Sequence, residues 1–196
     1  MTAYVRGCAV CQSTKPNTVH PKLPTLPITH EQQQHPFQTI VMDLITDLPV
    51  SRGYDSILMI VDQGCTKAAV FLPCHKTIDA VGVASLYAQR VFPFYGVPRC
   101  VISDRDPRFT AQFVKELCCM LNISQNLSTA YHPQTDGQSE RANQHVEQYL
   151  RIYGNNEKND WVDLLALAQF THNTWPNEST KQTPFDLLIG HTPTMC

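Results

Sequence analysis

The apolar residues of this chain follow two different spacings, and the change between them predicts the order of its elements. Three aliphatic and β-branched stretches come first: TIVMDLITDL at 39–48, SILMIVD at 56–62 and KAAVFLP at 67–73. Continuous apolar runs of this length, separated by turn residues such as those at 51–55, are typical of buried strands. The two short connections predict an antiparallel three-stranded meander.

Helical spacing replaces the strand pattern after the third stretch. One helix is expected at 77–95, with Thr77 or Asp79 as its cap. A fourth strand, RCVIS at 99–103, and a fifth at 125–129 alternate with further helices. Those helices are expected at 107–121, 136–153, 161–173 and 183–188. This order predicts an α/β fold in which a five-stranded mixed sheet is flanked by helices.

The first 36 residues differ from the rest of the chain. Residues 16–36 hold five prolines and three glutamines with little apolar periodicity, which is typical of an extended linker. We therefore expect a short segment at 1–15, a linker at 16–36 and one globular domain at 37–196. No apolar run approaches the ~20 residues of a membrane helix, so no membrane partner is expected.

Charge and cysteine content narrow the class of protein. Charged residues make up 16% of the chain, and the net charge is −2 with a pI near 6.4. This balance argues against a protein that holds DNA mainly through a basic surface, but not against an enzyme whose carboxylates gather metal ions. Eight cysteines at irregular spacing indicate free thiols in a reducing compartment. Cys100, Cys118 and Cys119 are expected in the core.

Three acids occupy unusual places in this pattern. Asp43 lies inside an apolar strand, Asp104 follows the fourth strand, and Glu140 lies in the first turn of the helix after the fifth. The ends of neighbouring strands and the following helix form the usual crevice of such sheets. Converging carboxylates suit Mg²⁺, and two such ions about 4 Å apart serve phosphoryl transfer.

Simpler roles for these acids stay open. With 17 acidic residues, such a spacing often arises by chance. Asp104 or Asp106 would serve equally well to cap the next helix, and Glu140 would favour a helix N-terminus electrostatically. Asp43 has no capping role in mid-strand. Asp47 and Asp62, at strand ends, are expected to be turn or solvent acids.

Two further motifs could bind ligands, one a nucleic acid and the other a zinc ion. The segment 131–138, YHPQTDGQ, is expected to be a mobile loop beside the site, able to stack on bases and bond phosphates. Cys8 and Cys11 form half of a zinc site, but no histidine follows at a usual spacing. The alternative for the 131–138 segment is an ordinary connection between a strand and a helix. The alternative for Cys8 and Cys11 is that they are two unliganded thiols.

The segments VMDLITDLPVSRGYDSILMIVD, ISDRDPRFT and STAYHPQTDGQSERANQ closely resemble retroviral-type integrases of Gypsy/Ty3-like LTR retrotransposons. The resemblance implies a ribonuclease H-like fold and assigns Asp43, Asp104 and Glu140 as the catalytic, metal-binding triad. It implies two Mg²⁺ ions, with Mn²⁺ as a substitute. Two reactions follow: water cleaves near the 3′ end of the element's DNA, and the freed 3′-hydroxyl then attacks target DNA.

The resemblance also implies partners and departures from the family pattern. The side chains expected to contact DNA are Tyr131, His132, Gln134, Asp136, Gln138, Asn143 and Gln144, the last two on the exposed face of Glu140. Residues 1–15 match the end of an integrase zinc-binding domain without its histidines, so bound Zn²⁺ is not expected at Cys8 and Cys11. A homodimer through the helices at 77–95 or 161–173 is expected, with DNA as partner and the nucleus, and the cytoplasm during replication, as location.

Two other functions remain open at this point. One is a catalytically silent integrase relic that only binds nucleic acid or dimerises. The other is a general ribonuclease H-like metal nuclease, which would nick DNA without joining strands. The intact set of three acids favours an active transferase over a relic, and the 131–138 segment favours an integrase over a nuclease.

Overall fold

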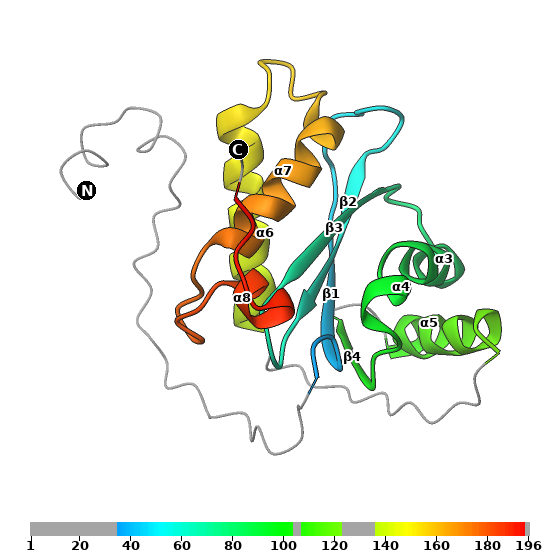
Figure 1. Cartoon of the computed structure of the whole chain (residues 1–196). Helices are drawn as coiled ribbons and strands as arrows, with labels where there is room; N and C mark the ends of the chain where they lie inside the picture. The colour runs from blue at the N-terminus through cyan, green and yellow to red at the C-terminus, as the bar shows by residue number, and fades with distance from the viewer. Residues whose placement is uncertain (1–34, 104–106, 123–135, 195–196) are drawn as a thin grey trace.

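The computed structural model describes residues 35–103, 107–122 and 136–194. A central sheet separates two groups of helices, with α3, α4 and α5 on one side and α6, α7 and α8 on the other (Figure 1). Within the described residues, no helix is both long and apolar enough to span a membrane. The elements, in chain order, are β1 (Thr39–Ile45), β2 (Ser56–Asp62), β3 (Ala69–Cys74), α3 (Ala80–Arg90), α4 (Phe92–Tyr95), β4 (Cys100–Ser103), α5 (Pro107–Met120), α6 (Asp136–Tyr153), α7 (Trp161–Thr174) and α8 (Pro184–Ile189).

The sheet has the strand order β3-β2-β1-β4. Strands β1, β2 and β3 pair antiparallel, which confirms the predicted meander. Strand β4 pairs parallel with β1, from Thr39 opposite Cys100 to Met42 opposite Ser103. The described sheet is therefore mixed and four-stranded, and the fifth strand predicted at 125–129 lies outside the described residues.

Successive side chains of each strand point to opposite faces of the sheet, so the protein has one hydrophobic core on each face. Met42, Leu58 and Ile60 pack with α3 and α5, whereas Met59 and Phe71 pack with α6 and α7. Because successive strand side chains point to opposite faces, Asp43 falls on the side of α6 and α7. The second core closes over it with helix residues that include Ala142, Val146, Trp161, Leu165 and Ala168.

Two strands are shorter than their apolar runs predict. Strand β1 ends at Ile45 rather than at residue 48, and β3 begins at Ala69 rather than at residue 67. Asp47 has a φ of 64° and Lys67 a φ of 63°. These left-handed conformations are incompatible with a strand, so the chain leaves or enters the sheet beside them.

The helix predicted at 77–95 is two helices. Asp79 caps α3 by accepting a hydrogen bond from the Gly82 N–H at 2.8 Å, so the cap is Asp79 and not Thr77. Pro93 lies in the first turn of α4 and lacks the N–H that a continuous helix needs. Helix α4 ends at Gly96, whose φ of 74° suits glycine.

Candidate active site

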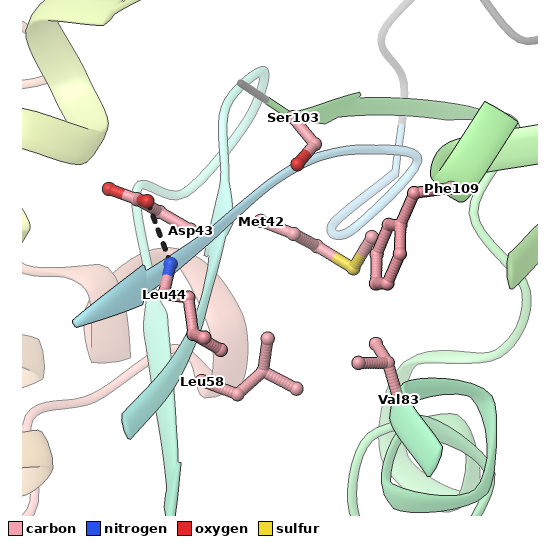
Figure 2. A pocket seen from close by; sticks show the side chains of 7 residues that line it. All are labelled: Met42, Asp43, Leu44, Leu58, Val83, Ser103 and Phe109. Atoms are coloured by element: carbon pink, nitrogen blue, oxygen red, sulfur yellow. Dashed lines mark hydrogen bonds between the residues drawn. The ribbon is translucent and has the colours of Figure 1, made fainter. Parts of the chain in front are cut away.

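Asp43 occupies the centre of β1, paired with Met59 of β2. Its half-buried carboxylate accepts a hydrogen bond from the Leu44 N–H at Oδ1, at 2.7 Å. Oδ2 accepts from the side-chain amide of Asn143 on α6. Figure 2 shows the carboxylate projecting away from Met42 and Phe109, which lie across β1. The carboxylate therefore faces helix α6, and its hydrogen-bond donors among the described residues are both neutral.

A small hollow lies on the opposite side of β1. Its lining consists of Met42, Asp43, Leu44, Leu58, Val83, Ser103 and Phe109 (Figure 2). Apart from Asp43 and Ser103 these side chains are apolar, and a charged substrate needs convergent polar groups. The hollow is therefore a gap in the packing between the sheet and α3 and not a substrate site.

Asn143 links helix α6 to the centre of the sheet. Its NH₂ group faces Asp43, as it must for an ionised carboxylate that only accepts hydrogen bonds. Its other amide atom, Oδ1, is buried and has no hydrogen-bond partner among the residues that the structure describes. A buried amide oxygen without a partner is rare in proteins. Asn143 is half-buried, so the prediction that it lies on an exposed face of α6 is wrong, whereas Gln144 is exposed.

The β1–β4 pairing brings the end of β4 to Asp43. Ser103, the last residue of β4, is paired with Met42, the residue before Asp43. Glu140 belongs to α6, one helical turn before Asn143, although the described part of that turn is its backbone alone. Asp104 lies outside the described residues. The meeting of β1, β4 and α6 is therefore the candidate site.

The remaining side chains predicted to contact DNA divide into two groups. Tyr131, His132 and Gln134 lie outside the described residues. Asp136 and Gln138 lie in the first turn of α6, described only by its backbone. Their contacts with DNA remain predictions, as does the zinc-domain end at 1–15 with Cys8 and Cys11.

The surroundings of Asp43 are suited to a hard cation. Within the described residues no lysine, arginine or histidine forms an ion pair with it. The groups beside Asp43 that can still accept a ligand bond are oxygen atoms, those of the carboxylate and the Asn143 amide oxygen. Oxygen ligands are those that Mg²⁺ prefers. The described side chains alone assemble no group of three metal-ligating residues, and Asp104 and the side chain of Glu140 are not among them.

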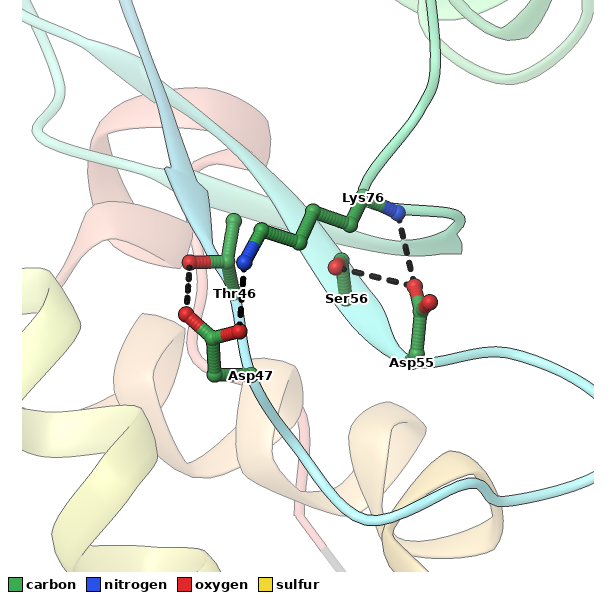
Figure 3. Close-up of polar contacts among 5 residues, drawn as sticks. All are labelled: Thr46, Asp47, Asp55, Ser56 and Lys76. Carbon is green, nitrogen blue, oxygen red and sulfur yellow. Dashed lines mark hydrogen bonds and ion pairs between the residues drawn. The ribbon is translucent and has the colours of Figure 1, made fainter.

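Other strand-end acids have structural roles. Asp47 pairs with Lys76 at 2.6 Å, and Asp55 accepts from the Lys76 N–H at 2.7 Å (Figure 3). The hydrogen bond from Lys76 lowers the pKa of Asp47, and the backbone hydrogen bond lowers that of Asp55. This confirms Asp47 as a solvent acid, tying the β1–β2 connection to the segment after β3.

Asp62 is a turn acid, as predicted, but it is fully buried. Its carboxylate accepts hydrogen bonds from the N–H and hydroxyl of Thr66, at 2.8 and 2.7 Å. Among the cysteines predicted in the core, Cys118 is buried, Cys100 is half-buried and Cys119 is exposed. The prediction for Cys119 is wrong because it lies on the outer face of α5.

Two histidines near the site escaped the sequence analysis. His145 of α6 and His172 of α7 have ring centroids 5.1 Å apart. Burial lowers the pKa of His145, and it lowers the pKa of His172 to about 4. The two residues are distant in sequence and on different helices, so no local spacing marks them as neighbours.

Known proteins share both the sequence and the fold. No family model matches the chain. It is 37% identical over 192 residues, 98% of its length, to the Transposon Tf2-3 polyprotein of Schizosaccharomyces pombe, and equally to the Tf2-4 polyprotein. The chain spans 14% of the length of these relatives.

Solved integrase structures superpose on this chain. The HTLV-2 integrase catalytic core domain, determined in complex with magnesium, matches with a TM-score of 0.59 and 18% identity, over 80% of this chain and 99% of that one. A chain of the simian T-cell lymphotropic virus intasome in complex with PP2A regulatory subunit B56 gamma matches with a TM-score of 0.63 and 16% identity, over 100% of this chain and 69% of that one. The catalytic core domain of BIV integrase matches with a TM-score of 0.54 and 21% identity, over 79% of this chain and 95% of that one.

The four-stranded mixed sheet with helices on both faces is thus the integrase catalytic core fold, which is ribonuclease H-like. In sequence the chain is similar to the Tf2 transposon polyproteins, and its fold is that of retroviral integrase catalytic cores.

Proposed function

We propose that this chain is the catalytic core for DNA integration, carrying out 3′-end processing and strand transfer. The observation that supports the proposal most directly is Asp43. It is a carboxylate in the centre of a sheet, it forms no ion pair with a lysine, arginine or histidine of the described residues, and it faces the helix that carries Glu140. A half-buried carboxylate without a counter-charge costs free energy, and a bound cation would offset that cost.

Three side chains would hold Mg²⁺: Asp43, Asp104 and Glu140. When bound, Mg²⁺ supplies positive charge that neutralises the phosphodiester and lowers the pKa of the attacking oxygen. The chain contributes position. The sheet holds the Asp43 backbone by its pairing with Met59 of β2, next to the Met42–Ser103 pair with β4, and Asn143 orients its carboxylate. A preorganised site of this kind needs little rearrangement during reaction.

DNA would lie along the N-terminal half of α6. Gln144 is exposed there, and Tyr131, His132, Gln134, Asp136 and Gln138 precede it in the sequence. Amide and aromatic side chains position nucleic acid through phosphate and base contacts. Both reactions would use the same site in turn, with water as the first attacking group and the DNA 3′-hydroxyl as the second.

The test is disintegration, the reversal of strand transfer, on a branched DNA with Mg²⁺ or Mn²⁺. Wild-type chain is expected to join strands, and Asp43→Asn, Asp104→Asn and Glu140→Gln are each expected to lose activity by on the order of 10³-fold or more. Asp47→Asn is the matched control, because Asp47 is an exposed acid that lies just after the end of β1. Unchanged activity in the three variants contradicts the proposal.

The DNA products separate the alternative functions. Joined strands indicate a transferase, whereas nicked strands alone indicate a metal nuclease. A folded wild-type chain that binds Mg²⁺ but gives neither product would be a silent relic. Each of these last two outcomes overturns the proposal.

We further propose that the core forms a homodimer and works on nuclear DNA. Helix α7 carries the exposed side chain of Leu167, and α3 carries that of Val81, with exposed fractions of 44% and 43%. Large exposed apolar side chains on neighbouring copies would be covered in a dimer. A nuclear location follows from the proposed target, which is chromosomal DNA.

A further inference from the structure

Helix α6 packs on the sheet through apolar residues such as Ala142 and Val146, and two polar residues, two positions apart, add contacts to other elements. Asn143 reaches Asp43 on β1, and His145 meets His172 of α7. The two imidazole rings lie edge to face, at an interplanar angle of 78°. His172 also meets Phe71 of β3 edge-on, at 5.9 Å between centroids. The histidine pair therefore joins α6 to α7 and to the sheet.

The histidine pair has few polar contacts among the described residues. Nδ1 of His145 is buried there without a hydrogen-bond partner, and Nε2 of His172 forms a 3.4 Å hydrogen bond with the Lys67 carbonyl oxygen. Within the described part of the chain, no carboxylate bonds or pairs with either ring. Protonating either ring would therefore bury an uncompensated charge beside a second imidazole.

The charged groups on the surrounding elements are engaged elsewhere. On α6, Arg141 pairs with Glu178 of the segment after α7, at 3.8 Å. In the β2–β3 turn, the Lys67 ammonium donates to the Gln63 carbonyl. The Asp62 carboxylate of the same turn accepts from Thr66. None of these groups supplies a counter-charge to the histidines.

The titration behaviour agrees with this geometry. Burial lowers the pKa of His145 and, together with His145 itself, lowers the pKa of His172 to about 4. A released and solvated histidine has a pKa near 6.5. Because the released form binds protons more readily, docking of α6 is fully favoured above about pH 6.5 and weakens as the pH falls toward 4.

We propose that His145 and His172 are positioning residues, whose uncharged contact docks helix α6 onto α7 and β3 and so holds Asn143 and Glu140 at the site. Protonation of the pair releases the helix. Neither histidine is placed in contact with DNA or metal. The effect on catalysis rests on the proposed function, whereas the docking of α6 does not.

Amide hydrogen exchange tests the docking directly. After correction for intrinsic exchange rates, amides at 141–153 are expected to be released roughly 20-fold more often at pH 5 than at pH 7, from the His172 shift alone. The double variant His145→Phe/His172→Phe keeps an aromatic edge-to-face contact but cannot ionise. In it, release should not change between the two pH values.

Two controls keep this test decisive. His191→Gln alters an exposed histidine and should retain the wild-type pH dependence. Should the double variant fail to fold, histidine NMR titration of wild-type chain replaces it. Both half-buried rings are expected to stay neutral at pH 6. The proposal is overturned if both rings titrate at or above pH 6.5. It is also overturned if the corrected amide exchange of the wild-type chain does not change with pH.

Disintegration assays then measure the consequence at the site. Wild-type kcat should fall between pH 7 and pH 5, because the released form gains population over that range, while KM for branched DNA changes little. The double variant should move this acid loss to lower pH by at least one unit. A wild-type chain inactive at every pH would refute the proposed function, yet the exchange result would still stand. Equal pH profiles in both chains would refute the positioning role.

Discussion

Asp43 shows how one residue can be functional because it is unsuited to its place. A mid-strand acid has no turn to stabilise and no helix to cap, and the donors that reach Asp43 from the described part of the chain are neutral. Its two hydrogen bonds hold the carboxylate in one orientation without neutralising it. That residue could be singled out from sequence alone, because the surrounding apolar run predicts burial.

Asn143 gives a prediction at the same scale. Asn143→Ala removes the donor to Asp43 and also the orphaned amide oxygen. The lost hydrogen bond costs about 1–3 kcal/mol, and the removed unsatisfied group offsets a similar amount. Urea unfolding should therefore show a change below about 1 kcal/mol, whereas disintegration activity should fall at least about tenfold.

The control for this prediction is Arg151→Gln on the same helix. Arg151 forms an exposed ion pair with Glu147, and such pairs contribute about 0–1 kcal/mol. Its activity should match wild type. An Asn143→Ala chain that keeps full activity, or one that unfolds far more readily than wild type, would show that the amide does not act by orienting Asp43.

At the scale of elements, α7 completes the sheet at its exposed edge. In the described sheet, strand β3 pairs with β2 on one side and has no strand on the other. On its other side, Asn173 bonds both the N–H and the carbonyl of Ala69, and Gln169 accepts from the Phe71 N–H. Side-chain amides thus take the place of a further strand. An unpaired edge would otherwise be a template for aggregation.

This arrangement predicts unequal costs for two substitutions in α7. Asn173→Ala leaves two backbone groups of Ala69 without partners and should destabilise the fold by about 2–4 kcal/mol. Gln169→Ala removes one bond from a half-buried position and should cost about 1 kcal/mol. Urea denaturation of both variants measures the difference. Equal losses of unfolding free energy in the two variants would show that the paired hydrogen bonds of Asn173 at the β3 edge add no stability beyond that of a single hydrogen bond.

The element boundaries show where sequence patterns have limits. Strand β2 and helix α6 have the bounds that their patterns predict. The single helix expected at 77–95 divides because Pro93 overrides a continuous apolar spacing. Strands β1 and β3 are trimmed by left-handed residues that are not glycine, Asp47 and Lys67. Nothing in their local sequence requires that conformation.

At the scale of the whole molecule, α7 is apolar on more than the face that packs on the sheet. Leu165 and Ala168 are buried, while Leu167 and the following Trp175 remain exposed. A helix that is apolar on both faces is commonly covered on both. The second cover is, in our proposal, another copy of the core.

Sedimentation over a range of concentrations tests this association. The wild-type core should approach a dimer in the tens of micromolar. Leu167→Lys should shift it toward monomer by about tenfold or more in Kd, because a buried lysine charge disfavours an apolar interface. Lys158→Gln, at an exposed loop position, is the control. A wild-type chain that stays monomeric throughout this range would contradict the dimer.

The sequence by itself determined the order of strands and helices, the mixed sheet and the acid at Asp43. These follow from local periodicity and from the cost of burying a charge, both of which are properties of short segments. Only the tertiary structure decided that Asn143 turns inward to Asp43, that His145 meets His172, and that Asn173 closes the edge of β3. Each of these joins residues between 27 and 104 positions apart, and packing, not local spacing, brings such residues together.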